Sequence, residues 1–222
     1  MKKQETLKRI QEIGLLPVLR ASSPEEALEI AVAIEAGGIA AIEVTMTVPR
    51  AVPLIERLIR EVGDRVLIGA GTVLDPETAR ACILAGAAFI VSPTLNLRTI
   101  EVCHRYSVAA IPGALTPTEV LTAWEAGADV VKVFPCSTMG GASYLEALKA
   151  PFPHIEVIPT GGVTVSRSAE FLEAGAFALG VGGDLVDRNA ISARTPWVIT
   201  NKAKEYTSII RSFRDRAILA QQ

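Results

Sequence analysis

The feature of this sequence that most constrains its fold is a unit of helix, glycine and strand that recurs along the chain. Four segments each end a helical pattern and precede an apolar run: Glu35-Ala36-Gly37-Gly38, Leu84-Ala85-Gly86-Ala87, Glu125-Ala126-Gly127-Ala128 and Glu173-Ala174-Gly175-Ala176. The first glycine of each segment suits the left-handed residue just past a helix end, where a Cβ would be costly. The gaps between segments are about twice the length of one strand-helix unit, so we expect an additional strand in each gap.

Apolar runs separated by helical patterns predict eight strands. After an opening helix over about Gln4 to Ile13, we expect strands at Leu15 to Arg20, Ala40 to Met46, Arg65 to Thr72, Ala88 to Pro93, Val108 to Pro112, Asp129 to Phe134, Glu156 to Thr160 and Ala178 to Gly182. Capping side chains predict helix starts at Ser22-Ser23-Pro24, Asp75-Pro76-Glu77, Thr116-Pro117-Thr118-Glu119, Ser166 and Thr195-Pro196-Trp197. This alternation favours an α/β fold, a (β/α)8 TIM barrel with an additional N-terminal helix.

The alternative architecture is a doubly wound open sheet. It would need a glycine-rich fingerprint after the first strand, and Arg20-Ala21-Ser22-Ser23-Pro24 is not one. The chain has no linker, low-complexity tract or break in composition, so we expect residues 1–222 to form a single domain.

Composition narrows the classes of function and location. Lysine and arginine number 22 against 24 acidic residues, a formal charge of −2 without a basic block, so nucleic acid and anionic membrane are not expected partners. The N-terminus leads into an amphipathic pattern rather than an apolar signal region, and no apolar run reaches membrane-spanning length. We therefore expect a cytoplasmic protein.

The cysteines and histidines are too few and too widely spaced to predict a metal site. Cys82, Cys103 and Cys136 are not spaced as a metal or redox motif and are interpreted as reduced, packed thiols. His104 and His154 stand far apart in the sequence, which disfavours a histidine metal site or a Ser-His-Asp triad. We expect neither a metal nor a cofactor.

A lysine interrupts the apolar stretch Val130-Val131-Lys132-Val133-Phe134-Pro135. Burying an ammonium group in a strand is costly unless the group is paired or used. Because alternate side chains of a strand share a face, Val130, Lys132 and Phe134 are expected to point one way, into the interior of a closed sheet. A structural lysine, either ion-paired or reaching the strand end, is the alternative interpretation.

A glutamate inside the second predicted strand gives that lysine a partner. Ala41, Glu43 and Thr45 share one face by the same alternation, as do Val18 and Arg20. One interior carboxylate and one interior lysine suggest amine catalysis, in which a neutral lysine forms a Schiff base with a ketone and the carboxylate moves protons. Lysine suits this chemistry because burial favours its neutral form, whereas arginine stays charged. The alternative is an ion pair that only fills the interior.

Glycine clusters follow the last two predicted strands. Thr160-Gly161-Gly162 ends the seventh strand, and Gly180-Val181-Gly182-Gly183-Asp184 ends the eighth. Exposed backbone N–H groups beside a helix N-terminus would bind an anion, and barrels commonly bind phosphate at this place. Glycine also ends strands for purely steric reasons.

Together these residues resemble one known family. Glu43-Val44-Thr45, Gly69-Ala70-Gly71-Thr72-Val73, Ser92-Pro93, Ile111-Pro112-Gly113, Lys132-Val133-Phe134-Pro135, Pro159-Thr160-Gly161-Gly162 and Gly182-Gly183 are similar in order and spacing to the 2-keto-3-deoxy-6-phosphogluconate (KDPG) and 4-hydroxy-2-oxoglutarate (KHG) aldolases. The resemblance runs from about Leu15 to Asp187. It implies a class I, metal-independent aldolase on a (β/α)8 barrel, usually a homotrimer, that releases pyruvate and either glyceraldehyde 3-phosphate or glyoxylate.

The resemblance also implies roles for individual residues. Lys132 matches the Schiff-base lysine, and Glu43 matches the general acid/base that works through a water. The positions that match the pyruvate pocket are Thr72, Pro93, Phe134 and Thr160, and those that match the phosphate cradle are Gly161, Gly162, Gly182 and Gly183.

Two departures bear on the substrate. Many members carry an arginine where this chain has Thr47, and others carry one where this chain has Arg20. The resemblance therefore implies that Arg20 and Thr47 are both substrate-binding residues, with Arg20 as the expected ligand of the keto-acid carboxylate. Serine often stands at the position of Gly183, and Asp184 follows here, which should weaken phosphate binding unless its carboxylate points away. Relatives of the galactonate pathway also have an aspartate there.

The resemblance implies cleavage of KDPG to pyruvate and glyceraldehyde 3-phosphate, with KHG as a further candidate substrate and a small keto acid as the partner molecule. Three alternatives remain at this point: a 2-keto-3-deoxy-6-phosphogalactonate aldolase, a non-catalytic barrel that binds a phosphorylated metabolite, and a barrel isomerase or decarboxylase. The last would need a glutamate or histidine base late in the chain, and none stands at a strand end.

Overall fold

Parallel β-structure forms the centre of the molecule. A computed structural model describes residues 2–193 and 195–219 of the chain. Its larger sheet has the order β5-β4-β3-β2-β1-β9, with β1 (Leu15–Leu19), β2 (Ala41–Thr45), β3 (Leu67–Gly71), β4 (Phe89–Val91), β5 (Ala109–Ile111) and β9 (Leu179–Val181). Its smaller sheet has the order β6-β7-β8, with β6 (Gly113–Ala114), β7 (Val131–Val133) and β8 (Val157–Pro159). The described pairings are parallel, which confirms the α/β class.

The two sheets curl toward each other at both edges. On one side, only Pro112 separates β5 from β6, and its carbonyl accepts a hydrogen bond from the Lys132 N–H at 2.8 Å. On the other side, Thr160 and Gly180 form a parallel bridge between the end of β8 and β9. The fifth strand ends within one residue of the predicted Pro112, but the short strand β6, which pairs with β7 directly after the proline, was not predicted.

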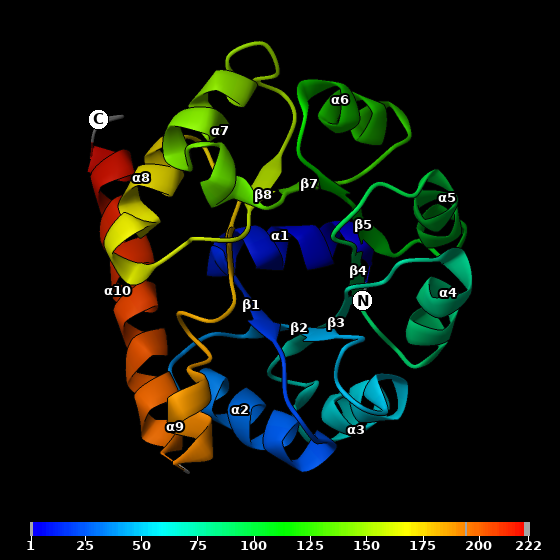
Figure 1. Cartoon of the computed structure of the whole chain (residues 1–222), viewed down its shortest axis with the longest axis vertical. Coiled ribbons are helices and arrows are strands. Elements are labelled where there is room, and N and C mark those ends of the chain that lie inside the picture. The colour runs from blue at the N-terminus through cyan, green and yellow to red at the C-terminus, as the bar shows by residue number, and fades with distance from the viewer. Residues whose placement is uncertain (1, 194, 220–222) are drawn as a thin grey trace.

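Helices surround this curled sheet (Figure 1). The helices that follow the strands are α2 (Pro24–Ala36), α3 (Ala51–Val62), α4 (Pro76–Leu84), α5 (Leu97–Arg105), α6 (Pro117–Glu125), α7 (Ala142–Lys149), α8 (Ser168–Glu173) and α9 (Arg188–Ser192). The long α10 (Pro196–Leu219) packs along α2 and α8. The first helix, α1 (Lys3–Ile13), lies across the space enclosed by the strands in this view.

Side-chain alternation divides the apolar residues into two cores. The inner core lies within the curl of the sheet and contains Ile10, Leu16, Ala41, Leu67, Phe89, Val91, Ala109, Ile111, Val130, Ile158 and Ala178. The outer core lies between the strands and the helices and includes Val131 and Val133 of β7. Ile10 reaches the inner core from α1, so this helix closes one end of the interior. The helix does not close the opposite end, where the strands terminate, so a binding or active site can form there.

At most of the predicted helix starts, the predicted side chain caps the helix by a hydrogen bond. Ser23 accepts a hydrogen bond from the Glu26 N–H, Asp75 caps α4, and Thr116 forms a reciprocal capping box with Glu119. The start predicted at Ser166 is displaced, because a 3₁₀ turn, η2 (Val165–Arg167), precedes α8.

The glycines at the helix ends follow the prediction in three segments of four. Gly86, Gly127 and Gly175 have positive φ values of 97°, 88° and 85°. In the first segment the prediction was wrong, because Gly38 has the positive φ of 90° and Gly37 has a φ of −84°. Gly37 has a packing reason instead: a Cβ there would lie 2.2 Å from the Cβ of Ala203 on α10. Within the described ranges, no helix is long and apolar enough to span a membrane.

Candidate active site

Lys132 lies on the inner side of the curled sheet, as strand alternation predicts. It is the middle residue of β7, and its neighbours Val131 and Val133 face the helices. The residue is only 5% exposed, so its ammonium group is withdrawn from bulk water. A lysine buried to this extent needs a specific partner or a chemical role.

Glu43 is the acidic neighbour of this lysine. It is the central residue of β2 and is 1% exposed. Its Oε1 lies 3.6 Å from Nζ of Lys132, close enough for an ion pair but too long for a direct hydrogen bond. Among the described residues, Oε1 has no hydrogen-bond partner. A buried carboxylate oxygen without a partner is costly, which favours a role in proton transfer over simple filling of the interior.

Gly71 of β3 makes the room for this carboxylate. A Cβ at Gly71 would lie 1.9 Å from Oε1 of Glu43, a distance at which the two atoms would overlap. Gly69, two residues earlier on the same face, makes equivalent room for the ring of Phe89. The two glycines of the Gly-Ala-Gly-Thr motif therefore shape the interior beside the acid rather than bind a ligand.

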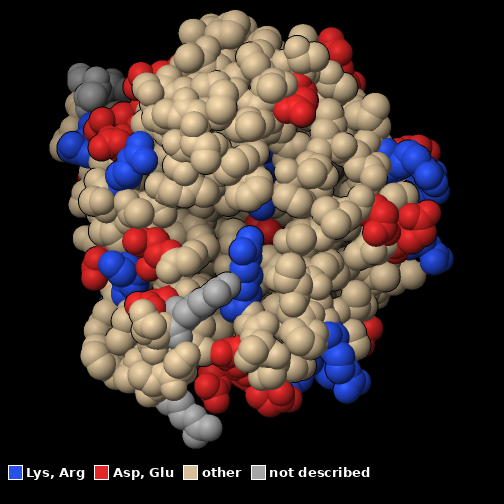
Figure 2. Space-filling model, viewed as in Figure 1, with Lys and Arg blue, Asp and Glu red and all other residues tan. Residues whose placement is uncertain are grey.

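A cavity of about 740 Å³ opens above Lys132 at the ends of the strands. Figure 2 shows this face hollowed in the middle, with blue and red atoms inside the hollow. The lining residues that the sequence had singled out are Arg20, Thr72, Pro93, Lys132, Phe134, Thr160, Gly161, Gly162, Gly182 and Gly183. Thus the structure gathers residues from six separate predicted strand ends around one amine.

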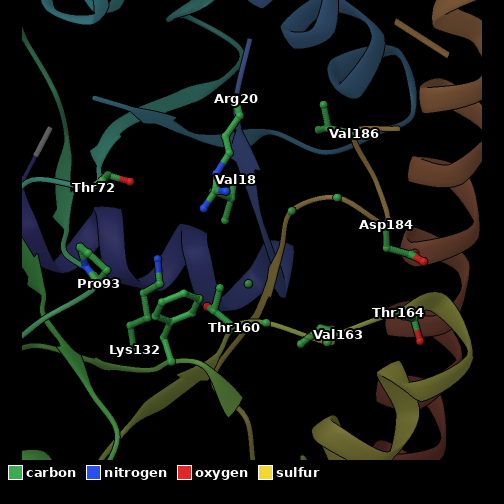
Figure 3. Close-up of a pocket in the computed structure, with 16 residues that line it drawn as sticks. Val18, Arg20, Thr72, Pro93, Lys132, Thr160, Val163, Thr164, Asp184 and Val186 are labelled. Carbon is green, nitrogen blue, oxygen red and sulfur yellow. The ribbon is translucent and has the colours of Figure 1, made fainter. Parts of the chain in front are cut away.

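Arg20 and Phe134 set the electrostatics around Lys132. In Figure 3 the Arg20 side chain extends from the end of β1 into the cavity, toward the side of Lys132. Nζ of Lys132 also lies 5.5 Å from the centroid of the Phe134 ring. A carboxylate that entered between Arg20 and Lys132 would meet a cation on each side.

Thr72 adopts a strained backbone conformation at the wall of the cavity. Its φ is +56°, a region that β-branched residues rarely occupy. Strain of this kind persists where the surrounding structure enforces it, and it often concentrates at functional sites. Thr72 lines the cavity together with Lys132 and Pro93, and it lies on the same side of the view as Pro93 (Figure 3).

The glycine loops after β8 and β9 supply unused hydrogen-bond donors. Within the described part of the chain, the backbone N–H groups of Gly162, Gly182 and Gly183 donate to no protein acceptor. Gly162 has a φ of +75°, and a Cβ there would lie 2.2 Å from the Cβ of Ser137. Free amides beside a cavity that also holds two cations favour an anionic ligand group.

Asp184 follows these donors, but its carboxylate is turned out of the cavity. Its Oδ2 accepts hydrogen bonds from the hydroxyl of Tyr206 at 2.6 Å and from the N–H of Val165 at 3.3 Å. Figure 3 shows the carboxylate directed toward α10 and away from Lys132. The carboxylate of Asp184 therefore points away from the cavity, so it should not weaken the binding of an anion there.

Thr47 is the one predicted substrate-binding residue that the structure keeps away from this cavity. It lies in the turn after β2, is exposed, and its Oγ1 is 2.6 Å from Oγ1 of Thr45. It lines a separate, shallower cavity of about 530 Å³ that also touches Arg20. The alternation of β2 does not extend into the turn, so the strand pattern gives no guide to where Thr47 points.

Several lining residues had no predicted role. These are Val18, Val163, Thr164, Gly180 and Val186. Asp184 also lines the cavity, but the sequence had singled it out only as a difference from the family pattern. Val18 shares the inner face of β1 with Arg20, so strand alternation could have added it. Val163 and Thr164 directly follow Gly161-Gly162, and extending that motif would have found them. Val186 carries no comparable signal.

The three thiols lie outside the site and are buried. Burial raises the pKa of Cys82 and Cys136 to about 11 and that of Cys103 to about 12. Neighbouring carboxylates, Asp75 for Cys82 and Asp129 for Cys103, act in the same direction. In the described residues, no group of three histidine, cysteine or acidic side chains is placed to hold a metal ion.

Comparisons with known proteins identify the family of this chain. Residues 6–201 match the family model described as "Aldolase: KDPG and KHG aldolase". The 2-dehydro-3-deoxy-6-phosphogalactonate aldolase of Escherichia coli K12 is 35% identical over 205 residues, which cover 92% of this chain and 96% of that protein.

Two solved structures are similar to this chain. One, the KDPG aldolase of Legionella pneumophila with pyruvate captured as a covalent carbinolamine, has a TM-score of 0.83 and 30% identity over 90% of this chain and 96% of that one. The other, a cube-shaped protein cage designed by fusing symmetric oligomeric domains, has a TM-score of 0.84 and 33% identity over 94% of this chain and 76% of that one.

Proposed function

Because the chain belongs to the KDPG and KHG aldolase family, we propose that it cleaves KDPG to pyruvate and glyceraldehyde 3-phosphate as a class I, Schiff-base aldolase. Membership of the family makes it an aldolase, a carbon–carbon lyase. The observation that carries the proposal is the buried pair in which Nζ of Lys132, a lining residue of the cavity, lies 3.6 Å from Oε1 of Glu43, a residue that does not itself line the cavity.

Lys132 carries the covalent steps. Its neutral amine adds to the C2 ketone, and loss of water gives an iminium between C2 and Nζ. The proton of the C4 hydroxyl leaves to the Glu43 carboxylate through a water, and the C3–C4 bond breaks. The bonding electrons move into the iminium, which gives an enamine of pyruvate and frees the aldehyde. Protonation at C3 and hydrolysis of the resulting iminium release pyruvate and restore the amine.

The other cavity residues bind and orient the substrate. Arg20 pairs with the keto-acid carboxylate at the mouth of the cavity. Thr72, Pro93, Phe134 and Thr160 enclose the pyruvate half, and Thr47, which lies outside this cavity, has no part in binding. The glycine loops, Gly161-Gly162 and Gly182-Gly183, bind the phosphate of the aldehyde half through backbone N–H groups. No step needs a metal or a cofactor.

A galactonate-derived substrate is the second candidate, with KHG as a further substrate. The similar Escherichia coli protein is named for the phosphogalactonate substrate, and Asp184 is the residue by which this chain resembles that branch. The KDPG and phosphogalactonate compounds differ in configuration at C4, the carbon whose hydroxyl faces Glu43. A direct comparison of cleavage rates for KDPG, its galactonate counterpart and KHG decides among them.

Borohydride trapping tests the central claim. With pyruvate present, reduction of the iminium should attach a stable adduct to Lys132, identified by peptide mass spectrometry. Adduct formation and turnover should both survive a chelator. A protein that binds phosphorylated metabolites without turnover, and without an adduct on Lys132, would instead be a non-catalytic binding barrel.

The finer features of the assembly belong to the same proposal. We take the two curled sheets as one (β/α)8 barrel that closes at Pro112 and at the bridge between Thr160 and Gly180, with residues 1–222 as a single domain. We also propose a cytoplasmic homotrimer. A similar chain serves as part of a cage built from symmetric oligomeric domains, which supports a symmetric oligomer. Light scattering of the purified protein tests the trimer.

A further inference from the structure

One carboxylate oxygen links the two glycine loops to the last helix. Tyr206 of α10 is fully buried, and its hydroxyl donates to Oδ2 of Asp184 at 2.6 Å. The same oxygen accepts the N–H of Val165, the first residue of η2, at 3.3 Å. Asp184 thus connects the loop after β9, the loop after β8 and α10 at a single point.

The direction of this carboxylate matters because its backbone lies at the cavity. Asp184 directly follows Gly183 and is itself one of the lining residues. Its carboxylate points toward α10 and away from Lys132 (Figure 3), and it accepts no hydrogen bond from the N–H groups of Gly182 and Gly183. A carboxylate turned into the cavity would stand next to any anion on those donors and repel it. Burial, and then the hydrogen bond to Asp184, raise the pKa of Tyr206, so its hydroxyl keeps its proton.

We propose that Tyr206 is a positioning residue for the anion-binding loops: its hydroxyl holds the Asp184 carboxylate out of the cavity and thereby keeps the loop free for a phosphate monoester. The inference rests on the proposed function for the substrate that carries this phosphate. Tyr206 itself does not line the cavity, so it acts through Asp184 alone.

A purely structural hydrogen bond makes a different prediction. Its loss would lower activity toward every substrate, or only lower stability, since the fold rather than the charge would be altered. The positioning role predicts a charge effect confined to phosphorylated ligands. KHG has no phosphate, so it reports on the fold and the chemistry but not on the loops.

The test compares Tyr206→Phe, the double variant Tyr206→Phe/Asp184→Asn, and Tyr144→Phe as the matched control. Tyr144 also donates a partly buried hydroxyl, to the carbonyl of Leu115, but it has no carboxylate partner. For Tyr206→Phe we expect KM for the phosphorylated keto acid to rise about tenfold at unchanged kcat, with KHG cleavage unaffected. The double variant should recover the wild-type KM, because the repelling charge is gone. Equal effects on both substrates, or no recovery, would overturn the inference.

Binding of inorganic phosphate, measured by calorimetry, separates this inference from the proposed function. Wild-type protein should bind phosphate, and Tyr206→Phe should weaken that binding about tenfold. Phosphate binding with this pattern, in a protein without aldol cleavage, would refute the proposed function and leave the positioning role standing. Absence of phosphate binding in wild type, or equal binding in Tyr206→Phe, would refute the positioning role whatever the turnover.

A second pair of variants covers the case in which Tyr206→Phe does not fold. Asp184→Glu extends the carboxylate beyond the place where Tyr206 holds it, and Asp184→Gln is its uncharged match in size. We expect Asp184→Glu to bind phosphate about tenfold more weakly than Asp184→Gln. Equal affinities in the two variants would contradict the proposal.

Discussion

Nζ of Lys132 and Oε1 of Glu43 lie 3.6 Å apart across the interior of the curled sheet, one on β7 and the other on β2. The two strands are not neighbours, so this approach depends on the curl of the whole sheet rather than on local pairing. Gly71 leaves the space that lets the acid reach this position. The proposed nucleophile and the proposed proton carrier are thereby held close to each other, as the proposed reaction requires.

Replacing Lys132 by arginine should separate the charge of this residue from its nucleophilicity. Arginine keeps a cation beside Glu43 but cannot act as a neutral amine. We expect Lys132→Arg to lose at least about a thousandfold in kcat while its far-UV circular dichroism stays native. Trapping with borohydride and pyruvate should give no adduct. Turnover within tenfold of wild type would exclude Schiff-base chemistry at this position.

Removing the lysine charge should destabilise the fold through Glu43. Lys132→Met leaves a buried carboxylate without its cation, which costs about 3 kcal/mol. The double variant Lys132→Met/Glu43→Gln removes both charges, so it should regain most of that free energy of unfolding. Urea unfolding of the wild type, both single variants and the double variant gives the coupling energy. Additive losses would mean that the two residues do not interact energetically.

Gly71→Ala should disable the acid without touching the amine. The added Cβ would overlap Oε1 of Glu43, at 1.9 Å, so the carboxylate must move away from Lys132. We expect kcat to fall about a hundredfold, since a displaced general acid/base loses its usual contribution. The borohydride adduct with pyruvate should still form on Lys132. A variant with wild-type kcat would show that the position of Glu43 does not govern the chemistry.

The period-two pattern of the strands predicted which side chains face inward, because alternation is a local property of an extended chain. It therefore placed Lys132 and Glu43 on inner faces, and the structure adds only their distance. The pattern fails where the strand ends, which is why Thr47 lies outside the main cavity. The hydrogen bond between Tyr206 and Asp184 joins α10 to the loop after β9, two elements that no local sequence pattern relates.

The buried thiols should make the fold sensitive to alkaline pH. Burial raises the pKa of Cys103 to about 12 and that of Cys82 and Cys136 to about 11, whereas an unfolded chain has the ordinary thiol value. The folded state thus holds these protons more tightly. The contribution of these thiols to the free energy of unfolding is complete below the ordinary thiol pKa and is lost as the pH rises toward 11. Each thiol should lose about 1 kcal/mol of this contribution between pH 9 and 10.

Urea unfolding at pH 7 and pH 10 measures this sensitivity. Cys82→Ala should lose some stability at both values through the missing sulfur, but the difference between the two values should shrink by about 1 kcal/mol. Iodoacetamide should label none of the three thiols in the folded protein at pH 8 and all of them in urea. If the free energy of unfolding of Cys82→Ala differed between pH 7 and pH 10 by as much as that of the wild type, the Cys82 thiol would not be a cause of the pH sensitivity.

The strained backbone conformation of Thr72 should lower the stability of the fold, whereas the residue itself should contribute to activity. Thr72 and Ser107 have nearly equal positive φ values, 56° and 55°, but only Thr72 lines the cavity above Lys132. Glycine removes the steric cost of this conformation at either position, so both Thr72→Gly and Ser107→Gly should keep or raise the melting temperature. Ser107→Gly should keep wild-type kinetics, whereas Thr72→Gly should lose about tenfold in kcat/KM because a wall of the pyruvate pocket is missing. Thermal unfolding and steady-state kinetics of the matched pair test this. A Thr72→Gly enzyme with wild-type kcat/KM would mean that the reaction needs neither the strained backbone nor the side chain of Thr72.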